Sequence, residues 1–190
     1  MRERDLLDQL NLFRRYTYSL HDPRYPMPIP GAGVPQGPPL QTNCCTFVEG
    51  LLVGPSGADW DSRRHRQMMI IDHDDLFSPV TALVETGVAR ALDPDDNPAP
   101  WSVMQGWRRL GVTGHTLIIV RHDPETDKAL VLEANNRTFN GVGWRGLGHI
   151  GSVGCEIPGD WRERIITTWA GLRLMYPHRA LCALNLEDGE

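Results

Sequence analysis

The sequence predicts an α+β fold, because segments with helical periodicity fill its first half and short β-rich runs fill much of its second half. From Cys44 to Leu52, apolar residues recur at the spacing of one helix face. After Gly114 the pattern changes to short apolar runs separated by turn residues, which is typical of antiparallel strands. The 190 residues, of which 41% are hydrophobic, are enough for a single domain spanning residues 1–190.

Periodic apolar residues predict the helices. The second helix follows the capping residues Thr42 and Asn43 and stops at Gly54-Pro55, and another follows Ser78, which would cap it. Between the first two helices, residues 22–40 are rich in proline and glycine and predict an irregular arm. The expected helices are residues 5–19, 44–53, 62–72, 79–91 and 160–175.

Turn residues at 123–127 separate two apolar runs and predict a β-hairpin. Residues 92–100 are expected to form a loop, and residues 137–148 are rich in glycine. The expected strands are residues 115–120, 129–132, 149–157 and 180–186. We divide the domain into an N-terminal helix and arm (1–40), a catalytic core (41–155) and a C-terminal helix and strand (156–190).

Composition excludes several classes of function. The net charge of −5 gives no overall attraction to nucleic acid or to an anionic membrane surface. No apolar run approaches the roughly 20 residues needed to span a bilayer. The N-terminus does not resemble a signal peptide, so we expect a cytoplasmic protein, unless phage lysis or a secretion system delivers it outside the cell.

The four cysteines, at 44, 45, 155 and 182, lack the Cys-x-x-Cys spacing of zinc sites and fit free thiols in a reducing compartment. The acidic run at 72–75 points its side chains in different directions and is a poor metal site. We therefore expect neither a metal nor another cofactor.

Cys44 is the candidate nucleophile. At the start of a helix, backbone N–H groups and the helix dipole favour the thiolate. Cys44 also lies on the apolar face of this helix, whereas Cys45 is rotated away from it by about 100°. The alternative is that Cys44 is simply a small buried apolar residue.

His115 begins a predicted strand, and Glu133 and Asn135 lie near the end of the partner strand. Their even spacing places Glu133 and Asn135 on one face, where either could orient the His115 ring. His115 could instead be a structural histidine, and His149 is the alternative partner for Cys44.

Three motifs resemble those of the NlpC-like and CHAP cysteine peptidases and amidases. Residues 43–48 (Asn-Cys-Cys-Thr-Phe-Val) resemble the start of their nucleophile helix, residues 114–120 their Gly-His strand, and residues 133–135 their Glu-x-Asn. The resemblance implies a papain-like fold, in which N-terminal helices and the nucleophile helix pack on a small antiparallel sheet. It implies that Cys44 attacks an amide carbonyl, His115 transfers the proton, and Glu133 or Asn135 orients His115.

The same resemblance favours a peptide of peptidoglycan as substrate. This sequence has Asn43 where the family has aspartate. The alternatives are a papain-like binding protein without activity and an intracellular thioester or isopeptide hydrolase or acyltransferase. By analogy, Gln41 is a candidate oxyanion donor beside the Cys44 N–H. Trp107 and Trp144 could line a substrate groove or pack in the core, and Arg145 could bind a carboxylate or face solvent.

Overall fold

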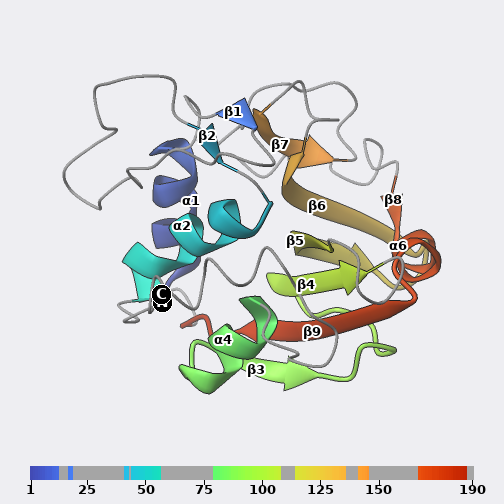
Figure 1. Ribbon diagram of the computed structural model, residues 1–190. Helices are drawn as coiled ribbons and strands as arrows, with labels where there is room; N and C mark the ends of the chain where they lie inside the picture. Colours follow the sequence, from blue (N-terminus) through green and yellow to red (C-terminus); the bar gives the residue numbers. More distant parts are fainter. Residues whose placement is uncertain are drawn as a thin grey trace.

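The computed structural model describes residues 1–12, 17–18, 41–42, 44–56, 79–107, 114–135, 141–145 and 167–187. They form a mixed structure of helices and a largely antiparallel sheet, so the fold class is α+β (Figure 1). The helices are α1 (Glu3–Leu12), α2 (Cys44–Ser56), α4 (Pro79–Glu85) and α6 (Trp169–Met175). The strands are β1 (Thr17–Tyr18), β2 (Gln41–Thr42), β3 (Ala89–Leu92), β4 (Ser102–Trp107), β5 (His115–Asp123), β6 (Lys128–Asn135), β7 (Gly141–Arg145), β8 (Thr167–Thr168) and β9 (His178–Leu184).

The sheet places the predicted hairpin at its centre. The strand order is β2-β1-β7-β6-β5-β4-β9-β3, and β8 pairs with the beginning of β6. All of these pairs are antiparallel except β1 with β2. Strands from both ends of the chain thus join one sheet, and β9, from the C-terminal segment, lies between β4 and β3.

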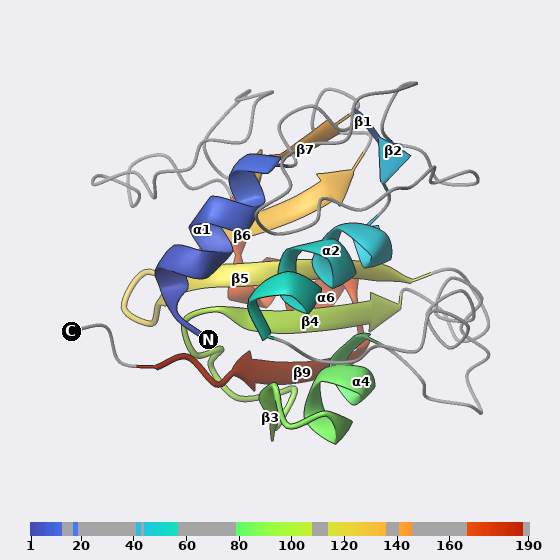
Figure 2. The ribbon, with the colours of Figure 1, turned by 90° about the vertical axis from the view of Figure 1, so that its left-hand side faces the viewer.

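Helices cover the sheet on both faces (Figures 1 and 2). Alternate residues of the central strands point to opposite faces, so that Ile118 and Leu117 belong to different cores. The core on the Ile118 face holds α1, α2 and α4, and the core on the Leu117 face holds α6. This arrangement buries the central strands on both sides, which explains their nearly continuous apolar sequence.

Helix α2 forms as its periodicity predicts. Phe47, Val48, Leu51 and Leu52 are fully buried on one face of the helix, packed against the sheet and α1. Helix α1 begins and ends earlier than residues 5–19, and its buried residues Leu6 and Leu10 form the predicted stripe.

Two predicted helix boundaries are wrong. The helix expected over 79–91 ends at Glu85, because the chain turns at Gly87, whose φ of 73° suits glycine, and residues 89–92 form β3. The C-terminal helix was expected to include residues 167 and 168, which form β8. The Thr168 side chain instead caps α6 by accepting a hydrogen bond of 3.0 Å from the Gly171 N–H.

Strands β4 and β7 have no counterpart among the predicted strands. The β4 sequence is buried at every position, so it lacks the alternation that marks a half-exposed strand. The hairpin residues do form paired strands, β5 and β6, each longer than predicted. The helix expected over 62–72 and the strand expected over 149–157 lie outside the described residues.

Candidate active site

Cys44 is the first residue of α2, and this end of the helix lies where β4 ends and β5 begins (Figure 2). The placement follows from the apolar face of α2, which packs against the sheet. The Cys44 side chain is buried, with 6% of the residue exposed. The backbone N–H of Thr116, on β5, donates a hydrogen bond that helps to lower the pKa of the Cys44 thiol. Cys44 therefore lies beside the strand that begins with His115.

His115 and Glu133 form an ion pair inside the protein. The distance from His115 Nε2 to Glu133 Oε2 is 2.7 Å, and Glu133 is fully buried. In this bond Nε2 is the donor, so Nδ1 is the ring nitrogen that can exchange a proton with the Cys44 thiol. Glu133 is the member of the predicted Glu133/Asn135 pair that contacts the ring. Asn135 ends β6 on the same face, and its side chain lies outside the described part of the structure.

The surroundings of His115 favour its charged form. Burial alone would lower the pKa of the imidazole, but hydrogen bonds and charge attraction to Cys44 and Glu133 outweigh burial and raise it to about 9. His115 therefore carries a positive charge at neutral pH.

The pKa of the Cys44 thiol is held well below its usual value. The largest cause is a hydrogen bond from the Cys45 side chain, and burial opposes it. The hydrogen bond and charge of His115 lower the pKa further. These effects favour a thiolate at Cys44 beside an imidazolium at His115, the form in which a cysteine is nucleophilic.

Cys45 stays protonated. Its hydrogen bond to Cys44, its burial and the Cys44 charge raise the pKa of the Cys45 thiol well above the usual value. The two sulfur atoms are 4.0 Å apart, and Cys45 Sγ lies 3.2 Å from Thr116 Oγ1. The Thr116 hydroxyl in turn donates to Gln105 Oε1 on β4. A row of polar side chains therefore leads from the Cys44 sulfur to the neighbouring strand.

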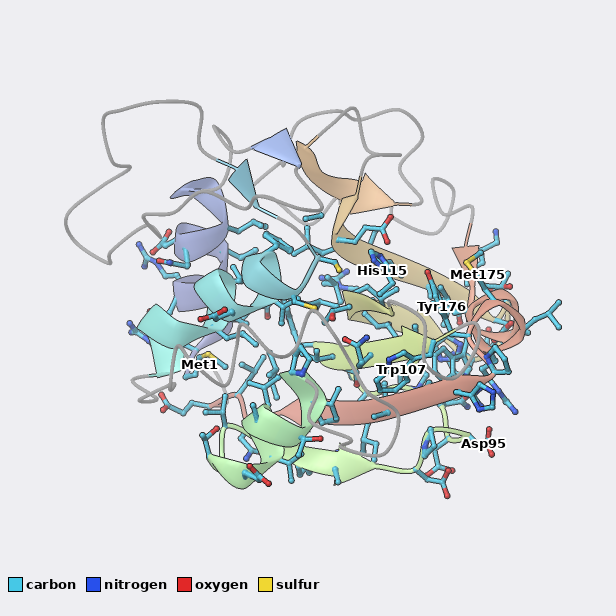
Figure 3. All side chains as sticks on the ribbon, viewed as in Figure 1. Met1, Asp95, Trp107, His115, Met175 and Tyr176 are labelled. Atoms are coloured by element: carbon cyan, nitrogen blue, oxygen red, sulfur yellow. The ribbon has the colours of Figure 1, made fainter. Side chains whose placement is uncertain are left out.

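The Tyr176 ring stacks beside the His115 ring (Figure 3). The ring centroids are 6.1 Å apart and the ring planes are inclined by 25°. Gly106 allows this contact, because a Cβ atom at position 106 would lie 2.6 Å from Tyr176 Cγ. Sequence reasoning missed Tyr176, which lies outside the three motifs; a glycine in the middle of a buried strand was the available signal of a close approach.

Comparisons of the chain with protein-family models, with curated proteins and with solved structures found no match.

The remaining predicted site residues are described in part or not at all. Trp107 is buried at the end of β4, with 7% of the residue exposed, and Trp101 packs in the α2-side core. Gln41 lies in β2, and Trp144 and Arg145 lie in β7, where only the backbone is described. Asn43, His149, Cys155 and residues 72–75 lie outside the described residues.

Nowhere in the described residues do three His, Cys, Asp or Glu side chains come together as the ligands of a metal ion would. No helix in the same residues has the length and apolar character needed to cross a membrane.

Proposed function

We propose that this protein is a cysteine hydrolase that cleaves an amide bond, with Cys44 as nucleophile, His115 as acid and base, and Glu133 as the residue that orients His115. One observation carries the proposal: a thiol of lowered pKa at a helix start lies beside a histidine held by a buried carboxylate. The helix supplies a nucleophile, the strand a base, and the partner strand a carboxylate that orients the base. Acyl transfer by a thiolate uses these three groups.

In the first half of the proposed reaction, Cys44 Sγ attacks the amide carbonyl carbon. A C–S bond forms while the carbonyl electron pair moves to oxygen. As the C–N bond breaks, the His115 proton passes to the leaving nitrogen, which departs as an amine. The products are a thioester on Cys44 and a neutral His115, still held by Glu133.

In the second half, neutral His115 removes a proton from water, and the resulting hydroxide attacks the thioester carbonyl. The C–S bond breaks, the acid is released and the Cys44 thiolate is regenerated beside a protonated His115. The hydrogen bond from Nε2 to Glu133 fixes the ring through both halves, so that the same nitrogen accepts and donates the proton.

The resemblance of the three motifs to NlpC-like and CHAP enzymes favours peptidoglycan stem peptides as the substrate. The rival function is a binding protein of papain-like fold without turnover. The burial of Cys44 favours this rival, because a nucleophile must be reached by its substrate.

Selective alkylation tests the proposal. We expect iodoacetamide at pH 6–7 to modify Cys44 much faster than Cys182, whose thiol pKa burial raises to about 12. Peptide mapping by mass spectrometry would measure both rates in one sample. Equal, slow modification of the two thiols would favour the binding protein.

Digestion of purified cell wall tests the substrate. We expect the wild-type protein to release new amino groups and the Cys44→Ala variant to release none. A Cys182→Ala variant is the matched control, because it also removes a buried thiol and lies outside the site. If Cys44 is alkylated selectively but cell wall stays intact, the nucleophile stands and the peptidoglycan assignment is wrong.

A further inference from the structure

Two N–H groups near the proposed active site are buried and have no hydrogen-bond partner: Gln105 Nε2 and Trp107 Nε1, both on β4. Such groups are rare in folded proteins, because burying a donor without an acceptor destabilises the fold. Another donor of this kind in the described residues, Trp169 Nε1, lies in the core beside α6. The two donors of β4 thus occur together at the end of the sheet where Cys44 lies.

Both donors lie close to Gly114. A Cβ atom built on Gly114 would overlap Gln105 Nε2 and would lie 2.7 Å from the Gly106 backbone oxygen and 2.9 Å from Trp107 Cδ1, the ring atom bonded to Nε1. Gly114 directly precedes His115, and Gln105 connects through Thr116 and Cys45 to Cys44. The two donors therefore come together beside Gly114, next to the proposed acid–base and to the polar side chains that lead to the proposed nucleophile.

The direction of the Gln105 amide is set by its neighbour. The Thr116 hydroxyl donates to Gln105 Oε1, so the amide nitrogen faces away from Thr116 and toward Gly114. Thr116 itself is fully buried and lies 3.2 Å from the Cys45 sulfur. The unpartnered donor is thus held in place before any ligand binds, as a preorganised site requires.

We propose that Gln105 Nε2 and Trp107 Nε1 bind the carbonyl oxygen of the acyl group that Cys44 attacks. This inference rests on the proposed function and names the residues that stabilise its transition state. When the C–S bond forms and the carbonyl electron pair moves to oxygen, two neutral donors in a buried setting stabilise the new negative charge. When the pair returns and the C–N bond breaks, the oxygen is again a weak acceptor.

Two small reagents separate this role from the reactivity of the thiol. p-Nitrophenyl acetate acylates a thiolate through a tetrahedral oxyanion, whereas methyl methanethiosulfonate reacts at sulfur and forms no oxyanion. We expect Gln105→Met and Trp107→Phe to slow acylation of Cys44 by p-nitrophenyl acetate roughly 100-fold, the usual effect of losing one oxyanion donor. The rate with methyl methanethiosulfonate should change less than about threefold in both variants.

The outcomes are distinct. An unchanged acylation rate in Gln105→Met and Trp107→Phe, with normal acylation of the wild-type protein, overturns the oxygen site and leaves the proposed function standing. An equal fall in both rates overturns it as well, because the substitutions would then act on the thiolate. Failure of wild-type Cys44 to be acylated refutes the proposed function and this inference together. Trp107→Phe keeps an aromatic ring and supplies the test if Gln105→Met does not fold.

Discussion

Cys44 and Cys45 are adjacent in the chain, yet their environments change their acidity in opposite directions. The pKa of Cys44 is lowered and that of Cys45 is raised, and in each case the hydrogen bond between the two side chains is the largest cause. Cys45 has one proton and two acceptors within reach, the Cys44 thiolate at 4.0 Å and Thr116 Oγ1 at 3.2 Å. We therefore assign Cys45 the role of donor to the proposed nucleophile Cys44, and not that of a second nucleophile.

Replacing Cys45 tests this role. We expect Cys45→Ala to raise the pKa of Cys44, because the thiolate loses its donor, and to slow alkylation of Cys44 at pH 6. Cys45→Ser is the matched control, since its hydroxyl can still donate, and it should stay close to the wild type. The pH dependence of the alkylation rate measures the pKa of Cys44. The same profile for the alanine variant and the wild type would contradict the assignment.

The thiolate–imidazolium pair predicts a bell-shaped pH profile for acylation of Cys44. The thiolate is present above the lowered pKa of Cys44, so the rate falls when acid protonates the sulfur. The imidazolium is present below about 9, the pKa of His115, so proton donation to a leaving group is lost above that pH. The two limbs belong to the pair as a unit.

Glu133→Gln tests whether the pKa of His115 sets the alkaline limb of this profile. Removing the carboxylate charge takes away one of the effects that raise the pKa of His115, so the alkaline limb should move to lower pH. Glutamine is nearly the same size as glutamate and can still accept the Nε2 proton, which keeps the variant folded. We would measure initial rates of cleavage of a p-nitroanilide, whose amine leaving group needs a proton, from pH 4 to 11. An alkaline limb that stays in place would show that Glu133 does not act on His115.

At the residue level, the sequence allowed Cys44, His115 and Glu133 to be placed together, because capping residues and strand spacing fix where each side chain lies along its element. It could not choose between Glu133 and Asn135, since both point to one face of β6. It also did not identify Tyr176, because Gly106 can indicate a close approach to its strand but not which distant residue makes it. Local periodicity specifies an element, whereas contacts between elements depend on the assembled sheet.

At the level of elements, β4 shows what sequence periodicity cannot detect. Its residues, Ser-Val-Met-Gln-Gly-Trp, are all buried, they do not alternate between apolar and polar, and Val103 is the single β-branched residue among them. β4 pairs with β5 and β9, and Gly106 lies opposite His115 in the register. The strand thus carries both Gln105 and the glycine that lets Tyr176 reach the His115 ring.

We expect Gly106→Ala to destabilise the protein by about 1–3 kcal/mol, the usual cost of overpacking a core. The new Cβ would lie 2.6 Å from Tyr176 Cγ, and Tyr176 is buried and cannot easily move aside. Denaturant unfolding measures the loss. In the double variant Gly106→Ala/Tyr176→Ala, the added methyl group should cost less, because the ring atoms Cγ and Cδ1 that it strikes are gone. Equal costs in the two backgrounds would show that the ring is not the obstacle.

At the level of the whole molecule, the candidate site depends on strands from distant parts of the chain. β9 lies between β4 and β3, and β4 in turn holds β5, which begins with His115. The C-terminal strand is therefore internal to the sheet. The position of His115 in the sheet therefore depends on the pairing of β4 with β9, a strand from the C-terminal segment.

Ala183 pairs with Arg90 on one side and with Ser102 on the other, so it lies in an internal strand where proline removes a backbone donor. We expect Ala183→Pro to cost at least about 2 kcal/mol more than Ala183→Gly, which also removes the methyl group but retains the backbone N–H. Because the sheet carries His115, the proline variant should also lose the selective alkylation of Cys44 at temperatures where the glycine variant keeps it. Thermal unfolding and peptide mapping on the same samples measure both effects. Similar stability and similar alkylation in the two variants would show that β9 is not an internal strand. The proposed dependence of the site on the pairing of β9 would then be wrong.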